Sequence, residues 1–381
     1  MKLLIVSAAP FIYKRDNICA YSPYVNELVI WNKFASEIIF CCPVWKSENG
    51  LLVTPIPFSI TKHLKIYNFN ISSISNIFKA FFYSLNSIYV LFIAMQQADH
   101  IHLRCPGNIG LLGCLVQILF PNKQKSAKYA GNWDPKSKQP LTYKLQKFIL
   151  SSTFLTKNIQ VLVYGEWEGS TKNIKPFFTA SYYERDKTSF DFLKKQKEAH
   201  VNELSTPFLF VGTLSKGKQP LYAVQLVEQL QHLGNKVHLD LYGDGIERSK
   251  LEKYILENNL KNCITLHGNK TAEEVQKAYQ ESSFLVLPSK SEGWPKVVAE
   301  AMFWGCLPIA SAVSCVPNML DSGNRGIILT MNLEEDVHQI NVVLNNSDLY
   351  QCQVESAVEW SRTYTLDYFE QEIKEVLQKL K

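Results

Sequence analysis

Residues 291–302 read "SEGWPKVVAEAM" and follow an apolar run, "FLVLP", that is typical of a buried strand. Pro295 suits the first turn of a helix, because the proline ring fixes the backbone angle and its missing N–H is not needed there. The stretch therefore predicts a strand, a short loop and a helix start. Free backbone amides from about Trp294 to Val297 would offer a positive helix end to diphosphate or sugar oxygens.

Two glutamates flank this helix start, Glu292 on the loop and Glu300 two turns into the helix. The carboxylate of Glu292 is placed to accept hydrogen bonds from sugar hydroxyls, and Glu300 is expected to face the same way and bind a ribose diol. A capping acid followed by a solvent-facing helical acid is the alternative for the pair taken alone.

A second strand–loop–helix pattern, "FVGTLSKGKQP", runs from a buried strand into Gly212, a loop with Lys216 and Lys218, and a helix near Pro220. Backbone amides at a helix start with lysines nearby favour a phosphate or diphosphate, although an ordinary solvated loop has the same composition. Neither the dinucleotide G-x-G-x-x-G spacing nor the P-loop spacing is present.

Short strand-like runs alternate with helix-length segments along the chain, a pattern that predicts parallel α/β architecture. The expected strands are "LLIVSA", "SEIIFCC", "HIHLR", "KYAG" and "IQVLVY", then "FLFVGT", "VHLDLYG", "CITLHG", "FLVLP" and "LPIAS". A charged segment near 185–205 lacks strand signal and predicts a linker. We therefore expect two Rossmann-like domains facing each other across a cleft, with ligands beyond the carboxyl ends of the strands. "LYGDG" and "LHGNKTAEEV" are expected at such ends, the latter with a capping box of Thr271 and Glu274.

Charge divides unevenly between the two halves. Residues 1–200 hold 24 Lys+Arg against 12 Asp+Glu, a balance of +12, whereas residues 201–381 hold 16 against 23, a balance of −7. The basic half indicates a negatively charged partner, with anionic lipid or a phosphorylated acceptor as candidates, or else a solvated face. Its densest run, at 123–147, lacks the aromatic spacing of a nucleic-acid motif.

Cysteine usage and hydropathy indicate where in the cell the protein is located. Nine scattered cysteines without Cys-x-x-Cys pairs favour a reduced, cytoplasmic protein without a metal site. The N-terminus "MKLLIVSAAPF" is interpreted as a first buried strand rather than a signal peptide. The apolar segment 77–95 is interrupted by polar residues, so we expect a buried or interfacial helix rather than a spanning one.

The order of these motifs over about 205–381 resembles the donor domain of family 4 glycosyltransferases of the GT-B fold. The spacing of Glu292 and Glu300, a glutamate, seven residues and a second glutamate, is the strongest part of the resemblance. Over 1–204 the likeness is looser and rests on strand order and on "ADHIHLRCPGNIG". The resemblance implies an acceptor-binding domain at 1–204, a nucleotide-sugar-binding domain at 205–362, and a helix at 363–381 that returns to the first domain.

The resemblance also implies roles for individual residues. Glu300 would hold the ribose, Glu292 would lie by the donor sugar and diphosphate, and Lys218 would neutralise the departing diphosphate. The residues expected at the donor site are Gly212, Thr213, Lys216, Lys218, Gly243, Gly268, Asn269, Gly293, Trp294, Pro295, Lys296 and Glu300.

Two positions depart from the family pattern. Thr213 stands where the family usually has arginine, and Lys216 is expected to compensate as a point charge. The segment "KYAGNWDP" carries Asn132, Trp133 and Asp134 where a histidine is common, so Asp134 or Asn132 would take the catalytic role of that histidine.

The resemblance thus implies a retaining, metal-independent transferase that moves a sugar from a nucleotide diphosphate donor to a surface polysaccharide or lipid-linked oligosaccharide. The location expected is the cytoplasm, with peripheral attachment at the inner face of a bacterial membrane. A GT-B nucleotide-sugar epimerase and a catalytically degenerate partner subunit are the alternatives.

Overall fold

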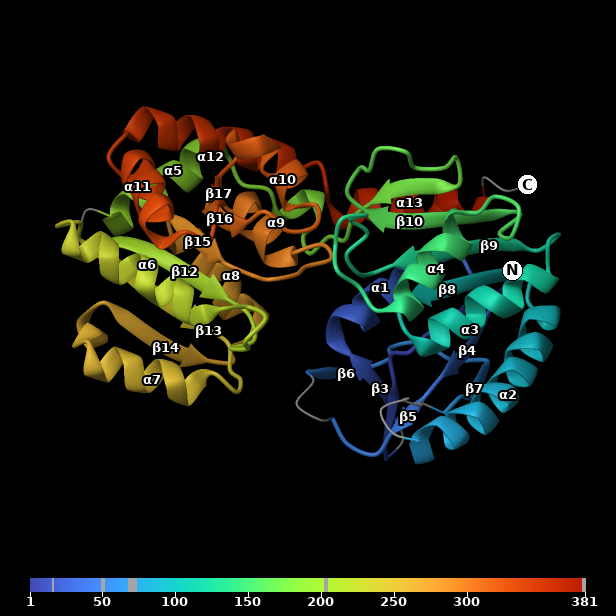
Figure 1. Ribbon diagram of the computed structural model, residues 1–381. Helices are drawn as coiled ribbons and strands as arrows, with labels where there is room; N and C mark the ends of the chain where they lie inside the picture. The colour runs from blue at the N-terminus through green and yellow to red at the C-terminus, as the bar shows by residue number, and fades with distance from the viewer. Residues whose placement is uncertain (16, 49–51, 68–73, 202–204, 379–381) are drawn as a thin grey trace. The chain divides into compact units, whose positions relative to one another are not determined.

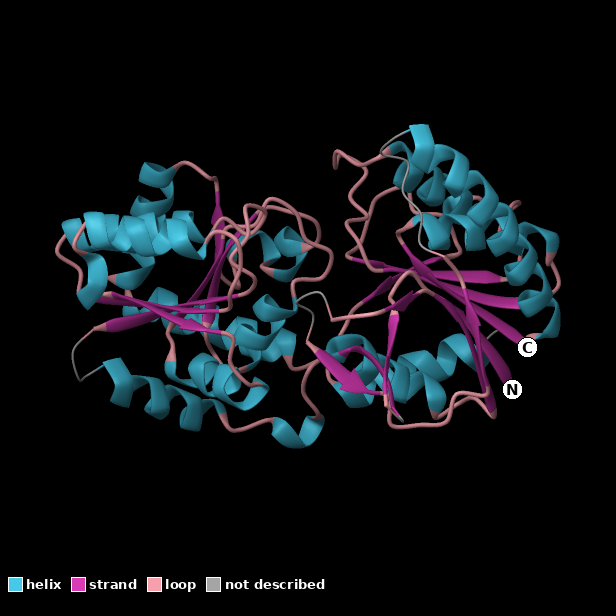
Figure 2. Cartoon of the chain, turned by 90° about the horizontal axis from the view of Figure 1, so that it is seen from below, coloured by secondary structure: helices cyan, strands magenta, loops and turns pink. Residues whose placement is uncertain are grey.

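The computed structural model describes residues 1–15, 17–48, 52–67, 74–201 and 205–378. The chain divides into two compact units, which we describe separately. Unit 1 comprises Met1–Phe177 together with Glu370–Lys381, and unit 2 comprises Phe178–Phe369. Each unit contains its own parallel sheet with helices packed on it (Figures 1 and 2).

The main sheet of unit 1 has seven parallel strands in the order β11-β10-β9-β8-β1-β4-β7. Their bounds are β1 Lys2–Val6, β4 Glu37–Cys42, β7 Lys62–Lys65, β8 His100–Cys105, β9 Gln124–Tyr129, β10 Ile159–Tyr164 and β11 Ile174–Phe177. The five predicted strands are confirmed, and β7 and β11 are additions at the two edges. The order reverses between β1 and β8, which creates a topological switch point at their carboxyl ends. A small sheet lies beside it, formed by β2 Phe11–Lys14, β3 Asn17–Tyr21, β5 Val44–Trp45 and β6 Val53–Pro55.

Helices α2, α3 and α4 form one layer of unit 1 (Figure 1). The helices of this unit are α1 Ser22–Asn32, α2 Ile74–Gln97, α3 Asn108–Val116, η1 Gln117–Leu119 and α4 Leu141–Ser151. One side of α2 packs into the core of unit 1. It carries Leu91, Ala94 and Met95, whose helical spacing places them on the same side of the helix. Within the residues that the structure describes, no helix is long and apolar enough to cross a bilayer.

Two lysines of the basic run 123–147 are buried inside unit 1, so only part of this run can face a partner or solvent. Lys125 and Lys128 are fully buried on β9. The ammonium of Lys125 donates to the carbonyls of Gln117 and Phe120, and that of Lys128 lies 2.9 Å from a carboxylate oxygen of Glu27. Burial lowers the pKa of Lys125 to about 8. Composition cannot reveal this arrangement, because the sequence does not say which side chains on a buried strand meet an acceptor inside.

The sheet of unit 2 has six parallel strands in the order β14-β13-β12-β15-β16-β17. Their bounds are β12 Thr206–Val211, β13 Val237–Tyr242, β14 Ile264–Gly268, β15 Phe284–Leu287, β16 Leu307–Ser311 and β17 Ile327–Leu329. The remaining elements are α6 Pro220–His232, α7 Arg248–Glu257, η3 Leu260–Asn262, α8 Ala272–Glu281, α9 Lys296–Phe303, α10 Val316–Met319, η4 Asp321–Gly323, α11 Leu333–Leu344 and α12 Ser347–Ser361. All five predicted strands are confirmed, and the order reverses between β12 and β15.

The segment before β12 belongs to unit 2, so the division lies at 177/178 rather than at 204/205. It contains η2 Glu184–Asp186 and α5 Phe190–Val201. Leu193 of α5 is buried, and the ammonium of Lys197 donates to the carbonyls of Tyr279, Gln280 and Ser282 at the end of α8. These bonds satisfy helix-terminal carbonyls and fix α5 against this unit. The predicted linker extends over 202–204, which lie outside the described residues.

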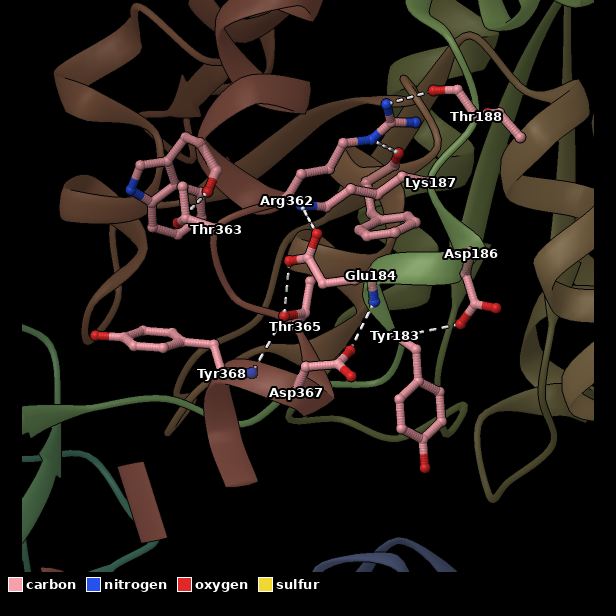
Figure 3. A network of polar contacts seen from close by, with 12 residues as sticks. Tyr183, Glu184, Asp186, Lys187, Thr188, Arg362, Thr363, Thr365, Asp367 and Tyr368 are labelled. Atoms are coloured by element: carbon pink, nitrogen blue, oxygen red, sulfur yellow. Dashed lines mark hydrogen bonds and ion pairs between the residues drawn. The ribbon is translucent and has the colours of Figure 1, made fainter. Parts of the chain in front are cut away.

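The two places where the chain passes from one unit to the other are joined within unit 2 (Figure 3). Glu184 is central: its backbone N–H donates to Asp367, and its carboxylate accepts from Thr365 at 3.1 Å. Arg362 donates to the carbonyl of Thr188 at 2.6 Å. The final helix, α13 Leu366–Gln378, begins in unit 2 and belongs to unit 1 from Glu370 onward. There Glu370 pairs with Lys33 and Glu372 with Lys175.

All nine cysteines lie within the described residues, and no disulfide joins them. Eight are buried, and Cys352 on α12 is exposed. Burial raises the pKa of the Cys41, Cys306 and Cys315 thiols to about 12.

Candidate donor-binding site

The predicted donor residues gather at the carboxyl edge of the unit 2 sheet. The loops after β12, β13 and β15 carry, respectively, Gly212–Lys218, Gly243, and Glu292 with Gly293. Gly268 is the last residue of β14, and Asn269 follows it. Because parallel strands end at the same edge, these loops share one side of the sheet. The structure thus brings together four motifs that lie up to about eighty residues apart in the sequence.

Glycines at this edge are required by close backbone packing. A Cβ on Gly243 would lie 2.0 Å from the carbonyl oxygen of Gly212, and the φ angle of Gly243 is +136°. The N–H of Gly243 donates to the carbonyl of Gly268, and the N–H of Gly212 donates to Tyr242. Gly243 and Gly268 therefore shape the edge, with no side chain between the strands and a ligand.

Lys218 and Glu292 meet at the switch point between β12 and β15. The Lys218 ammonium lies 2.5 Å from Glu292 Oε1, and the Glu292 side chain is only 10% exposed. A backbone bond from Lys290 N to Gly217 O, 2.8 Å long, holds the two loops together. Helix α6 starts at Pro220, as expected from the sequence. A cation and a carboxylate thus face the position where an open α/β sheet binds its ligand.

Glu300 has different partners. Its Oε1 accepts from the Ser181 hydroxyl at 2.5 Å, and its Oε2 accepts from the Tyr279 hydroxyl at 3.1 Å. The sequence placed Glu300 beside Glu292 on one face of the helix start. It gave no signal that Ser181 and Tyr279, 119 and 21 positions away in the chain, would bind this carboxylate.

The remaining predicted donor residues divide into exposed and packed groups. Thr213, Lys216 and Asn269 are exposed on their loops. Helix α9 starts at Lys296, with Pro295 as the residue before it. The Gly293 carbonyl accepts from Ser314. The Trp294 ring packs with aromatic rings of the same unit, namely Phe178, Trp360 and Tyr364.

A polar cluster that the sequence did not reveal lies along the neighbouring strands β13 and β14. Asp240 on β13 accepts from His267 at 2.6 Å and from His238 at 3.2 Å. Burial raises the pKa of Asp240, but the two histidine hydrogen bonds outweigh it and lower that pKa overall. The Tyr242 ring stacks on His267, with centroids 4.4 Å apart. Strand alternation could have placed these residues on one face, but not identified their contacts.

Asp134 and Asn132 lie in unit 1, on the loop after β9. Asn132 Oδ1 accepts from the N–H of Asp134 at 2.9 Å, and Asp134 Oδ1 accepts from the N–H of Lys136 at 2.8 Å. Both side chains therefore stabilise turns of their own loop. Lys147 donates to the Asp134 carbonyl at 3.3 Å and lies over the Trp133 ring. Burial lowers the pKa of Lys147 to about 8.

A search for metal ligands covered the residues that the structure describes. Among them, no group of three or more His, Cys, Asp or Glu side chains is arranged to hold a metal ion.

Comparison with known proteins finds a family model that matches most of unit 2. Residues 191–360 match the family model "Glycosyl transferases group 1". This region of the chain is therefore similar to the group 1 glycosyltransferases. An uncharacterised glycosyltransferase of Methanocaldococcus jannaschii is 28% identical over 48% of this chain and 51% of its own length. A lipopolysaccharide 1,6-galactosyltransferase of Salmonella typhimurium is 28% identical over 39% of this chain and 42% of its own. The chain thus spans about half the length of these curated relatives.

Two further matches extend over both units. An uncharacterised protein encoded in the cps region of Klebsiella pneumoniae is 23% identical over 86% of each chain. The structure of the Anabaena protein HepE in complex with UDP and glucose superposes with a TM-score of 0.68, at 13% identity, over 99% of each chain. At that identity the likeness concerns the fold alone, and it confirms the expected GT-B fold class.

Proposed function

We propose that this protein is a glycosyltransferase that moves a sugar from a nucleotide diphosphate donor to a carbohydrate or lipid-linked acceptor, with retention at the anomeric carbon. The bond from the anomeric carbon to the diphosphate oxygen breaks, and a bond to an acceptor hydroxyl oxygen forms. The proton of that hydroxyl passes to the departing diphosphate. The observation that carries the proposal is the meeting of Lys218 and Glu292 at the β12/β15 switch point. The UDP and glucose in the HepE complex and the name of the Salmonella relative support this class of reaction.

Lys218 is suited to the departing diphosphate, because a fixed ammonium stabilises negative charge that grows as the bond breaks. Glu292 holds that ammonium in place and is positioned for donor hydroxyls. Glu300 binds the ribose. The charge of Lys218 supplies the compensation that a divalent cation would otherwise provide, so we propose that donor binding needs no metal.

The test begins with a panel of UDP, GDP, ADP and CMP sugars and measures thermal unfolding. A donor at a hundred times its dissociation constant stabilises the fold by about 2.7 kcal/mol. Lys218→Met should lose the shift, and EDTA should leave it unchanged. The donor that binds is then incubated with and without an oligosaccharide acceptor. A panel that leaves the melting temperature unmoved contradicts the proposal, and a changed sugar without acceptor identifies an epimerase instead.

We propose unit 1 as the acceptor-binding part, at its own switch point between β1 and β8. Arg104 near the end of β8 is 21% exposed and pairs with Glu27 at 2.9 Å, and Glu27 also binds Lys128. Two cations therefore share one carboxylate, which leaves a positive balance at this edge. Such a balance suits an acceptor that carries a phosphate or a carboxylate. Arg104→Gln should weaken use of an anionic acceptor more than use of its neutral analogue.

We further propose peripheral attachment to the inner face of the cytoplasmic membrane, through the outer side of the α2–α3–α4 layer. Phe82, Leu85, Tyr89 and Phe92 of α2 recur at helical spacing and are exposed, Phe82 and Tyr89 at 66% each. A helix with apolar side chains on both its core and solvent sides is unusual in water. On α4, Leu145 and Phe148 are also exposed.

Charge around this layer favours an anionic bilayer. Between residues 49 and 165 the sequence has twelve Lys+Arg and two acids, Asp99 and Asp134. Lys136, Lys138 and Lys144 are exposed, whereas Lys125 and Lys128 are buried. The electrostatic attraction of unit 1 to an anionic bilayer therefore depends on fewer lysines than the sequence suggested. Insertion of aromatic side chains into the bilayer contributes more to the proposed attachment.

The membrane test is co-sedimentation with vesicles of anionic and of neutral lipid. Replacing Phe82 and Tyr89 with asparagine should abolish binding, and replacing the three exposed lysines with glutamine should remove its salt dependence. Leu256→Asn, at an exposed leucine of unit 2, is the matched control. Wild-type protein that ignores both kinds of vesicle contradicts the attachment.

A further inference from the structure

The hydrogen bonds to Glu300 leave a specific set of acceptor positions open. Ser181 donates to Oε1 and Tyr279 to Oε2, at 2.5 and 3.1 Å. An ionised carboxylate has about four acceptor positions, two on each oxygen. Each oxygen of Glu300 therefore keeps one position. The two adjacent hydroxyls of a ribose offer two donors, which matches one open position on each oxygen.

The two donors fix the orientation of the Glu300 carboxylate. Tyr279 is fully buried on α8, and burial, reinforced by the Glu300 charge, raises the pKa of its phenol well above the ordinary value. The phenol thus remains protonated and can only serve as a fixed donor to Glu300. Two hydrogen bonds from separate segments prevent rotation of the carboxylate about its last bond, which a single bond would allow.

Ser181 is held by its own neighbours. It lies three residues after Phe178, where the chain enters unit 2. The ring of Tyr182 next to it packs on Phe303 and Trp304, with centroids 4.8 and 5.3 Å apart. The Tyr182 carbonyl accepts from the N–H of Leu366 at 2.8 Å, on the segment where the chain leaves the unit. The hydroxyl that orients Glu300 therefore lies on the segment where the chain enters unit 2. That entry segment is held in place by the segment where the chain leaves the unit.

We propose that Ser181 and Tyr279 are positioning residues for nucleotide binding, which orient Glu300 so that it accepts both ribose hydroxyls of the donor. This inference rests on the proposed function, because it requires that the site binds a ribonucleotide. It assigns to the entry segment a role in selecting ribose over deoxyribose. The selectivity arises from the geometry of Glu300 rather than from contact between Ser181 and the nucleotide.

The experiment measures dissociation constants by calorimetry for UDP, GDP and ADP and for their 2′,3′-dideoxy forms. Wild-type protein should prefer the ribose form of its nucleotide, and Glu300→Gln should remove most of that preference. Ser181→Ala and Tyr279→Phe should each reduce the preference roughly tenfold, the scale of one hydrogen bond to a charged group. Ser181→Thr restores a hydroxyl and should recover it. In turnover assays Ser181→Ala should raise donor KM more than it lowers kcat.

Ser189→Ala is the matched control, because Ser189 lies on the same segment and its hydroxyl oxygen accepts from the N–H of Phe192. It should leave the ribose preference unchanged. If both Ser181→Ala and Tyr279→Phe keep the full preference while Glu300→Gln loses it, the positioning role is wrong and the proposed function stands. If wild-type protein binds none of the three nucleotides, the proposed function itself fails and this inference fails with it.

Discussion

The ammonium of Lys218 lies 2.5 Å from Glu292 Oε1, although 74 residues separate them in the sequence. Their loops follow β12 and β15, the two strands between which the strand order of the sheet reverses. The pair therefore forms because of the topology of the sheet, and each residue restricts where the other can point. In the proposed reaction, an incoming diphosphate would meet a lysine that is already oriented, which would lower the cost of organising the site.

Removing the lysine charge should impair turnover. We expect Lys218→Met to lose about 2 to 4 kcal/mol of transition-state stabilisation, measured as kcat/KM, because one preorganised charge is lost at the leaving group. The double variant Lys218→Met with Glu292→Gln should lose less than the sum of the single losses, since the two residues act as a unit. Strict additivity would show that the pair is not part of one site.

Substitutions of Glu292 and Glu300 should affect different kinetic parameters. Glu300→Gln should mainly weaken nucleotide affinity through the ribose. Glu292→Gln should reduce kcat more than donor affinity, because it supports charge that develops during transfer. Steady-state kinetics together with nucleotide titration distinguish the two patterns. Wild-type parameters for both variants would mean that the donor site has been assigned to the wrong residues.

A methyl group at the sheet edge should be poorly tolerated. Gly243→Ala places a Cβ 2.0 Å from the Gly212 carbonyl oxygen, at a φ angle that disfavours any side chain. We expect the free energy of unfolding to fall by about 3 kcal/mol or more, measured with urea. Gly217→Ala is the comparison, because its new Cβ would have no neighbour closer than 3.9 Å, and it should be nearly neutral. Equal stability of the two variants would argue against the close backbone approach.

Acid should destabilise unit 1 through two buried histidines. His100 and His102 both contact the Ser126 hydroxyl, at 2.8 and 2.9 Å. Burial lowers the pKa of His100 to about 4, and burial together with nearby positive charge lowers that of His102 well below its ordinary value. Well above pH 6.5 both histidines are neutral in the folded and in the unfolded chain. As the pH falls below 6.5, the unfolded chain binds protons at these histidines while the folded chain does not, which favours unfolding.

The stability contribution of His100 should therefore be lost as the pH falls from about 6.5 to about 4, to the extent of about 3 kcal/mol. We expect His100→Gln, which does not titrate, to lose correspondingly less over this range. Urea unfolding at pH 7.5, 6, 5 and 4.5 gives the comparison. Parallel pH profiles for the two proteins would mean that His100 is protonated inside the fold.

The strands and the donor loops were predictable from sequence because each is a local pattern. A buried parallel strand is a continuous apolar run, and a glycine-containing loop before a helix marks its end. The contact between Lys218 and Glu292 was not predicted, because the resemblance implied only that each residue lies near the donor diphosphate. Short edge strands such as β7 Lys62–Lys65 carry too few residues to stand out.

Three features were beyond the sequence because they depend on tertiary contacts. Lys125 and Lys128 look like surface charge until their internal acceptors are known. The observed boundary between the units differs from the predicted one because Lys197 binds the end of α8. No local sequence pattern reveals that contact. Ser181 became part of the site through a single hydrogen bond across 119 positions. The proposed roles of Asp134 and of Thr213 with Lys216 remain predictions for the kinetic experiments.

The distribution of the cysteines allows a probe to be attached at one chosen position. Eight thiols are shielded by packing, and Cys352 projects from α12 into solvent. A maleimide dye or a nitroxide should therefore attach at one position of the unaltered protein. Introducing a second cysteine on unit 1 would then provide a pair for distance measurement with and without nucleotide. The distance between the two labelled positions could thus be measured in solution without first preparing a cysteine-free background.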